Sequence, residues 1–202
     1  FIYEEGYRGG EQILHQDLNG NGVRDLLVVS GNQIMVWRED GQPLFKIAPY
    51  GFKYTGTLTV AIADVTGDTR AEIMVTPSKG ALPLKYYDLD GNPARDDWYP
   101  LGKKYPNGFT LAVAGTGPKS ETRLIIGAGV GSEPRVYVFT TAQATVRNFL
   151  AYEKAFRGGV NVAAGDVDAN GRAEIIVGAG SGKGPVVRTF NEEGNQQGKE
   201  FV

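Results

Sequence analysis

The chain has 202 residues with 21 basic and 23 acidic side chains, a net charge of −2 and no cysteine, so disulfides and thiolate metal sites are excluded. The single histidine excludes a histidine-rich metal site, and the balanced charge provides no positive surface for nucleic acid. Glycine accounts for 29 residues, and no apolar run reaches the roughly 18 residues of a membrane span, so we expect short strands, many turns and no membrane insertion.

Four segments of the chain repeat one pattern: an apolar run, a polar loop and a second apolar run. In chain order they are residues 13–29, 60–75, 111–127 and 162–177. Asp17, Asp64, Gly115 and Asp166 hold the same position in them, at separations of 47, 51 and 51 residues. The period divides the chain into four units at about 8–55, 56–107, 108–158 and 159–202, which form a single domain over residues 1–202.

Each unit is predicted to contain four short strands. In the last unit we expect strands at residues 160–165, 173–178 and 186–190, a turn at 191–194 and a fourth strand beginning near Lys199. Four strands at a period of 40–50 residues are typical of a β-propeller. We therefore predict an all-β protein whose four repeats of about 50 residues are blades of four antiparallel strands. Two stacked β-sandwiches are the alternative, and the regular fourfold period argues against them.

The two ends of the chain fall at one position of the repeat. We expect residues 1–7 to complete the fourth strand of the last blade, so that paired termini close the ring within one molecule and remove exposed sheet edges. The same pairing between molecules would add a strand to a neighbour and build a fibre.

Three of the four loops between the apolar runs carry oxygen-bearing side chains at positions 1, 3, 5 and 9. They are Asp17, Asn19, Asn21 and Asp25; Asp64, Thr66, Asp68 and Glu72; and Asp166, Asp168, Asn170 and Glu174. Ca²⁺ takes six to eight oxygen ligands from carboxylates, amides, backbone carbonyls and water. We expect these side chains to bind the ion, together with the backbone carbonyls at position 7, which belong to Val23, Arg70 and Arg172.

Position 6 is glycine in the first and last of these loops, where Gly22 and Gly171 permit a sharp turn with positive φ. Thr69 stands there in the second loop and Thr66 is a weaker ligand at position 3, so we expect the second loop to bind least well of the three. An EF-hand is excluded, because it requires a bidentate glutamate at position 12 and flanking helices. Position 12 is valine in all three loops, and strands flank them.

The spaced acids, the apolar run and the exit Gly178-Ala179-Gly180 together resemble the FG-GAP repeats, also called VCBS-type repeats. Such repeats build the propellers of integrin α subunits and of many secreted bacterial and fungal proteins. The resemblance implies calcium held as a structural clamp, with two to three ions in this chain. We expect the loop at 166–174 to bind best. The third unit, residues 115–123, carries Lys119 and no acidic pair, so it is expected to be empty.

Two alternatives to calcium remain open. The loops could be solvated turns, since Asp, Asn and Gly favour turns without any metal. Na⁺ or Mg²⁺ could also replace Ca²⁺, although cages made only of protein ligands suit Ca²⁺ better than Mg²⁺.

The expected function is that of a non-catalytic, extracellular or cell-surface module in structure, adhesion or self-assembly. Its expected partners are a protein or a glycan on a cell surface, or copies of itself through strand exchange at the termini. A lectin-like propeller is one alternative, and it would bind sugars through the aromatic side chains of Trp37, Trp98, Tyr99 and Tyr105. An accessory domain of a larger secreted enzyme is the other. Fold alone argues function weakly.

Overall fold

A computed structural model describes residues 11–18, 21–115 and 121–201. Its strands form four separate four-stranded antiparallel sheets, each in chain order. This arrangement confirms the predicted all-β propeller of four blades and replaces the β-sandwich alternative. Across the described ranges, no helix has the length and apolarity needed to cross a bilayer.

The blades follow one another along the chain. Blade 1 contains β1 (Glu11–Gln16), β2 (Asp25–Ser30), β3 (Gln33–Trp37) and β4 (Pro43–Ile47). Blade 2 contains β5 (Leu58–Ala63), β6 (Glu72–Pro77), β7 (Leu84–Tyr87) and β8 (Pro93–Trp98). Blade 3 contains β9 (Phe109–Gly115), β10 (Thr122–Ala128), β11 (Arg135–Thr140) and β12 (Thr145–Leu150). Blade 4 contains β13 (Val160–Gly165), β14 (Glu174–Ala179), β15 (Val187–Phe190) and β16 (Gln196–Phe201).

In blade 4 the first three strands match their predicted positions to within one residue. The fourth strand differs, because β16 begins at Gln196, three residues before Lys199. It pairs with β15 over the register Phe190↔Gln196 to Val187↔Phe201. The predicted pairing of residues 1–7 with this blade lies outside the described residues.

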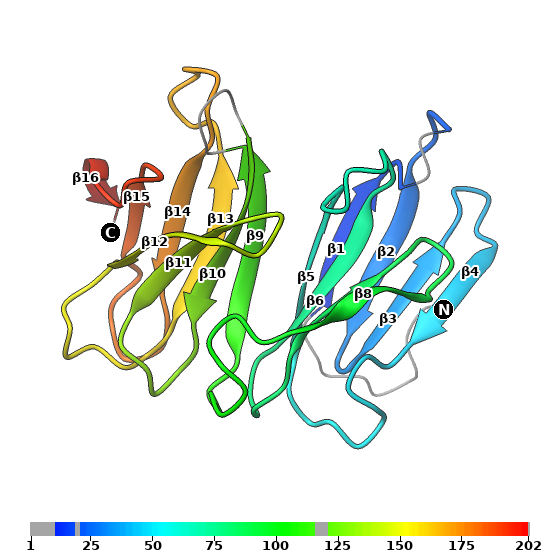
Figure 1. Cartoon of the computed structure of the whole chain (residues 1–202), viewed down its shortest axis with the longest axis horizontal. Helices are drawn as coiled ribbons and strands as arrows, with labels where there is room; N and C mark the ends of the chain where they lie inside the picture. Colours follow the sequence, from blue (N-terminus) through cyan, green and yellow to red (C-terminus); the bar gives the residue numbers. More distant parts are fainter. Residues whose placement is uncertain (1–10, 19–20, 116–120, 202) are drawn as a thin grey trace.

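Three apolar clusters hold the blades together. One joins blades 1 and 2 through residues such as Leu27 and Ile73. A second joins blades 2 and 3 around Met74 and Leu124, and a third joins blades 3 and 4 around Ile125. Among the described residues no such cluster joins blade 4 to blade 1, and Figure 1 shows β16 and β4 at opposite ends of the arrangement. The four blades therefore form an arc of consecutive sheets.

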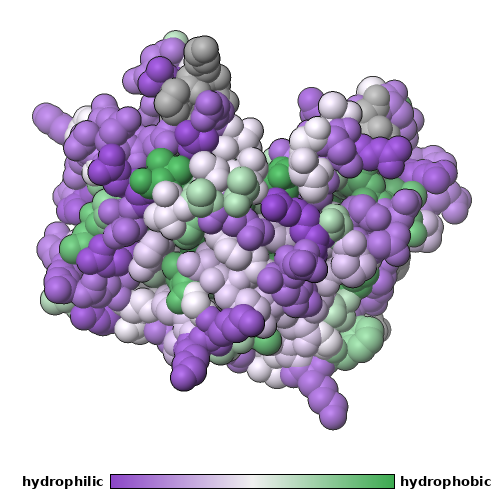
Figure 2. All heavy atoms as spheres, viewed as in Figure 1, coloured by the Kyte–Doolittle hydropathy of each residue, from purple (hydrophilic) through white to green (hydrophobic). Residues whose placement is uncertain are grey.

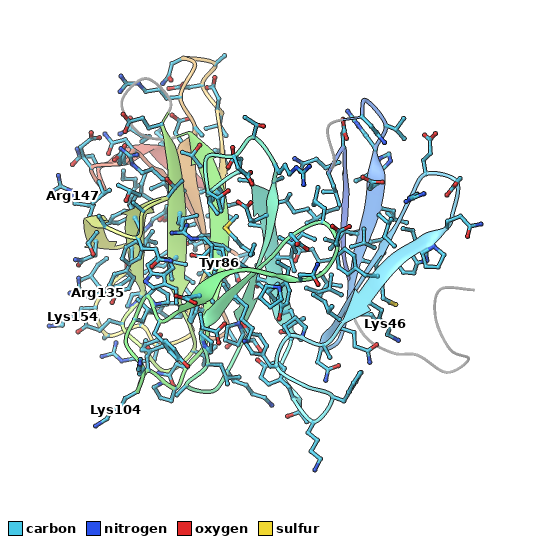
Figure 3. All side chains as sticks on the ribbon, turned by 45° about the vertical axis from the view of Figure 1, so that its right-hand side comes forward. Lys46, Tyr86, Lys104, Arg135, Arg147 and Lys154 are labelled. Carbon is cyan, nitrogen blue, oxygen red and sulfur yellow. The ribbon has the colours of Figure 1, made fainter. Side chains whose placement is uncertain are left out.

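Burial follows the order of the strands in each blade. The second strand is the most buried, and every residue of β6 is buried, because both faces of this strand contact neighbouring blades. The fourth strand is largely exposed, as in β16. Figure 3 shows the same gradient in the side chains: Tyr86, which is 1% exposed, lies inside, whereas Lys46, Arg147 and Lys154 project outward.

The Gly-Ala-Gly exits of the second strands have a steric cause. A Cβ atom on Gly129 would lie 2.0 Å from the carbonyl oxygen of Asn107, and one on Gly180 would lie 2.0 Å from that of Gly158. Real Cβ atoms do not approach an oxygen so closely. Only glycine at these two positions therefore lets the segment that precedes the first strand of the same blade pack against the end of the second strand.

Candidate metal centres

The three acidic loops join the first and second strands of blades 1, 2 and 4. In Figure 1 the described parts of these loops lie along the same edge of the arc, at the top of the view, and Figure 2 shows hydrophilic residues gathered there. The edge position follows from the repeat, because each loop connects the same two strands in every blade.

One hydrogen-bond pattern recurs in all three loops. The Oδ2 atom of the position 1 aspartate accepts the backbone N–H of position 6, at 2.8 Å for Asp17 and Gly22 and at 2.9 Å for Asp64 and Thr69. The side-chain oxygen at position 5 accepts the N–H of position 7, as between Asn170 and Arg172 at 2.9 Å. The predicted turn is therefore present, and it is held by the same oxygens that we expected to bind an ion.

The acid at position 9 is buried in each loop. Asp25, Glu72 and Glu174 are 2%, 3% and 5% exposed. One carboxylate oxygen of each accepts the backbone N–H of position 2, at 2.9 Å for both glutamates and at 3.3 Å for the shorter Asp25. This acid thus anchors the start of its loop to the second strand.

Two of the loops bring three carboxylates together. Oxygens of Asp64, Asp68 and Glu72 lie within 4.8 Å of one another, and so do oxygens of Asp166, Asp168 and Glu174. In the described part of the chain, no lysine or arginine forms an ion pair with any of these six carboxylates. Such a cluster of like charges, with one member buried, fits a cation, because buried charges in proteins are paired or coordinate a metal.

The first loop differs from the other two. It has two carboxylates, Asp17 and Asp25, so it does not form a three-acid cluster. Asn21 keeps its place, since its Oδ1 atom accepts the N–H of Val23 at 2.8 Å. Asn19 lies outside the described residues, so the predicted position 3 ligand of this loop is not placed.

The second loop departs from the pattern in two ways. Thr69 at position 6 has φ of 72°, a conformation that is strained for a β-branched residue. The hydroxyl of Thr66 at position 3 donates to Oε1 of Glu72 at 3.2 Å, so it is tied to the position 9 acid. The rest of the pattern is kept, since the backbone N–H of Arg70 at position 7 donates to Asp68 at position 5 at 2.9 Å.

Sequence reasoning missed two further acids near the second loop. A cavity of about 580 Å³ is lined by Asp68 and Glu72 and also by Asp88 and Asp90 of the β7–β8 turn. The strands that carry these two pairs are adjacent in the sheet, so the strand order is the signal that would have found them.

The third unit replaces the position 9 acid by Arg123. Its Nε atom lies 3.0 Å from Oε1 of Glu192 in blade 4, and its Nη2 atom lies 3.0 Å from Glu121. In this blade the buried group at position 9 is a cation, and two acidic side chains neutralise its charge. Lys119, on which the expectation of an empty third loop partly rested, lies outside the described residues.

Residues 17–75 match the model of a protein family described as the FG-GAP-like repeat. This segment is similar to an FG-GAP-like repeat. It contains the first two acidic loops and the strands between them, so over these residues the match confirms the resemblance drawn from the sequence. A search of curated proteins gives no match.

Solved structures with the same fold are longer than this chain. Rhamnogalacturonan lyase PL11 of Bacillus licheniformis superposes with a TM-score of 0.61 at 15% identity, over 91% of this chain and 41% of its own. Rhamnogalacturonan lyase YesW gives a TM-score of 0.58 at 15% identity, over 93% and 48%. BBS1N, solved in complex with ARL6DN, gives 0.57 at 15% identity, over 93% and 56%. This chain thus spans about half the length of these proteins, and at such identities the likeness concerns the fold alone.

Proposed function

We propose that this FG-GAP-like propeller is a non-catalytic extracellular module whose loops are clamped by calcium. One observation carries the proposal: Glu72 and Glu174 are buried, each converges with two aspartates, and none of these acids has a cationic side chain as partner among the described residues. Arg123, at the same repeat position, does have acidic partners. A bound cation in the other loops supplies the matching charge.

Each loop would hold its ion with the side chains at positions 1, 3, 5 and 9 and the carbonyl at position 7. Calcium supplies charge neutralisation and no reaction step. The hydrogen-bonded turn places the aspartates before the ion arrives, so little order remains to be imposed on binding. Two ions are favoured by the two three-acid clusters, and a third would occupy the loop of Asp17 and Asp25.

An extracellular location suits such sites, because calcium there is present at the millimolar levels that fill even weak ones. The partners would be a protein or a glycan on a cell surface, or other copies of the chain. Sugar binding through aromatics receives less support. Trp98 packs edge-on against Phe139 with ring centroids 4.9 Å apart, and the Tyr105 hydroxyl is engaged with Ser132 at 2.7 Å.

A second candidate is an accessory domain of a larger secreted enzyme. It is favoured by the lengths of the lyases, of which this chain spans 41% and 48%. Catalytic sequence in the same gene outside these 202 residues would establish it.

Thermal melts with calcium and with a chelator test the calcium proposal. A ligand that binds only the folded state raises the melting temperature by mass action. We expect a clear rise with Ca²⁺, a smaller one with Mg²⁺ and a reduced Ca²⁺ effect in Asp168→Asn. The matched control is Asp96→Asn, which changes an exposed carboxylate on β8 outside both clusters. Equal melting temperatures with calcium and chelator would remove the proposal.

A further inference from the structure

The charged side chains of the chain are divided between the two edges of the arc. The upper edge carries the acidic loops. The opposite edge, named the lower edge here, consists of the linkers between blades and the turns between second and third strands, and it lies at the bottom of Figure 1. Its described segments are residues 31–32, 48–57, 78–83, 99–108, 129–134, 151–159 and 180–186.

The lower edge is basic and the upper edge is acidic. The described segments of the lower edge contain seven cationic side chains and two acidic ones, Glu133 and Glu153. Twelve acidic and four basic side chains lie in the described loops of the upper edge, which are residues 17–18, 21–24, 38–42, 64–71, 88–92, 121, 141–144, 166–173 and 191–195. The balanced charge of the whole chain therefore conceals a positive surface, contrary to the expectation drawn from that balance.

The two edges are too far apart for their charges to cancel. The second strands that separate them have six or seven residues, which span about 20 Å at about 3.3 Å per residue. The Debye length at physiological ionic strength is about 8 Å. An anion near the lower edge therefore experiences a positive field.

Both acidic side chains of the lower edge already have cationic partners. Glu133 lies 2.9 Å from Nε of Arg135 and 3.5 Å from Nζ of Lys154. Glu153 lies 2.9 Å from Nζ of Lys183. Five exposed cations of this edge form no ion pair with a described acid, namely Lys53, Lys79, Lys103, Lys104 and Arg157. Figure 3 shows Lys104 projecting from the bottom of the molecule.

These five cations follow the edge and do not converge on one point. Lys53, Lys103 with Lys104, and Arg157 come from the three successive linkers, and Lys79 comes from the turn between β6 and β7. A row of cations attracts a chain of anionic groups more strongly than a single small anion, because each group meets its own charge. The edge therefore suits a linear polyanion.

A recess of about 290 Å³ lies among the segments of the lower edge, with walls from blades 2, 3 and 4. Short polar side chains line it, namely Thr57, Thr59, Ser78, Thr110, Asn161 and Ser181. Within the described residues, the hydroxyls of Thr57, Thr59 and Ser181 make no hydrogen bond. The volume is close to the ~300 Å³ of the smallest typical ligand pockets. It suits one sugar ring, whose hydroxyls can bind those of the wall.

Two of the unpaired cations border this recess in sequence. Lys79 follows Ser78 of the wall, and Arg157 precedes Gly158 of the wall. Hydroxyl groups and cations are thus combined in one place, which is the combination that an acidic sugar requires.

Two other anionic partners fit this edge less well. A membrane surface is bound through a broad apolar face, whereas the large apolar side chains exposed on the described lower edge are Phe52 and Val130. Single-stranded nucleic acid stacks its bases on aromatic rings. The tyrosines here serve the fold, since the hydroxyls of Tyr50 and Tyr152 donate to backbone carbonyls at 2.7 Å.

We propose that the lower edge binds an anionic polysaccharide, with one sugar ring in the recess and the acidic groups of the polymer on Lys79, Arg157 and the other cations of the row. The inference specifies the chemistry of the glycan partner named under the proposed function, and it rests on that function for the extracellular setting. It does not involve the calcium loops, which lie on the upper edge.

Calorimetric titration with soluble polysaccharides tests this inference. We expect dextran sulfate and hyaluronan to bind and neutral dextran not to bind. The tighter of the two anionic polymers identifies whether sulfate esters or carboxylates are preferred. Raising the salt from about 50 mM to about 300 mM should weaken both interactions, because exposed charges are screened.

Substitutions locate the site on the chain. Lys79→Gln and Arg157→Gln should each weaken binding about twofold to fivefold, because each removes one exposed charge contact. The matched control is Arg147→Gln, since Arg147 is exposed on β12, outside the lower edge. Thr57→Val removes a hydroxyl from the recess at constant charge and should weaken binding about threefold. Circular dichroism checks that every variant is folded.

Several results would overturn the inference. They are no binding of either anionic polysaccharide, full affinity in Thr57→Val, equal losses in Arg147→Gln and Arg157→Gln, and tighter binding of duplex DNA or phosphatidylserine vesicles than of both polymers. The titrations are repeated with a chelator, where we expect the same affinity. Calcium-dependent melting is measured separately, so failure of either proposal leaves the result for the other intact.

Discussion

The guanidinium of Arg123 and the carboxylate of Glu192 face each other across the interface of blades 3 and 4, with Nε and Oε1 3.0 Å apart. Their side chains are 8% and 10% exposed. Arg123 holds the repeat position of Glu72 and Glu174. This blade thus uses a side-chain cation at the place where the neighbouring loops gather carboxylates.

Removing one partner of this pair is expected to destabilise the fold. Arg123→Met leaves Glu192 buried without its counter-ion, which should lower the free energy of unfolding by about 3 kcal/mol. The double variant Arg123→Met with Glu192→Met should recover much of that loss, because an apolar pair of similar volume replaces a buried ion pair at little cost. Urea unfolding measures both. A double variant no more stable than the single one would contradict the assignment.

The strained position 6 of the second loop gives a prediction of opposite sign. Thr69 has φ of 72° where Gly171 has 85° in the last loop. Thr69→Gly should raise the free energy of unfolding by about 0.5–1 kcal/mol, the left-handed strain of threonine exceeding the entropy cost of glycine. The reciprocal Gly171→Thr should lower it by about 1–2 kcal/mol. Chemical denaturation in the presence of chelator separates this backbone effect from ion binding.

In two of the linkers between blades, one tyrosine ties the linker to the blade that follows it. The hydroxyl of Tyr152 donates to the carbonyls of Val177 at 2.7 Å and Val186 at 2.8 Å. Tyr50 makes the same pair of contacts in blade 2. Tyr152→Phe removes both hydrogen bonds, although the carbonyl of Val186 keeps the N–H of Ala179 at 3.0 Å, and it should cost about 1–3 kcal/mol in unfolding free energy. Tyr99→Phe is the control, and an equal loss there would refute the clamp.

Alkaline pH should weaken the same clamp. Burial raises the pKa of Tyr152 to about 12 and also raises that of Tyr50. An unfolded tyrosine with its ordinary pKa of about 10 therefore loses its proton first. The contribution of this tyrosine to the free energy of unfolding is therefore full below pH 10, and it is lost as the pH rises from 10 towards 12. Urea unfolding at pH 8, 10 and 11 checks this, and Tyr152→Phe should show a shallower decline.

The sequence was sufficient for features that repeat along the chain. The 50-residue period predicted the blades, and the apolar runs located β13 at residues 160–165 without error. The acidic loops were recognised because positions 1, 3, 5 and 9 are a short-range pattern. The pattern did not predict that the acid at position 9 is buried, or that it anchors the loop to the second strand.

Contacts between blades could not be predicted from the sequence. Arg123 and Glu192 are 69 residues apart, and nothing local to either marks the other, since their contact arises when whole sheets stack. The same holds for Tyr152 and its two carbonyls.

A crystal structure grown with calcium, with anomalous scattering recorded at a long wavelength, tests the central claim most directly. The account predicts a strong peak between the carboxylates of Asp166, Asp168 and Glu174, a second one beside Asp64, Asp68 and Glu72, and none at Arg123. Calcium-soaked crystals in which water alone stands beside Asp166 and Asp168 would contradict it.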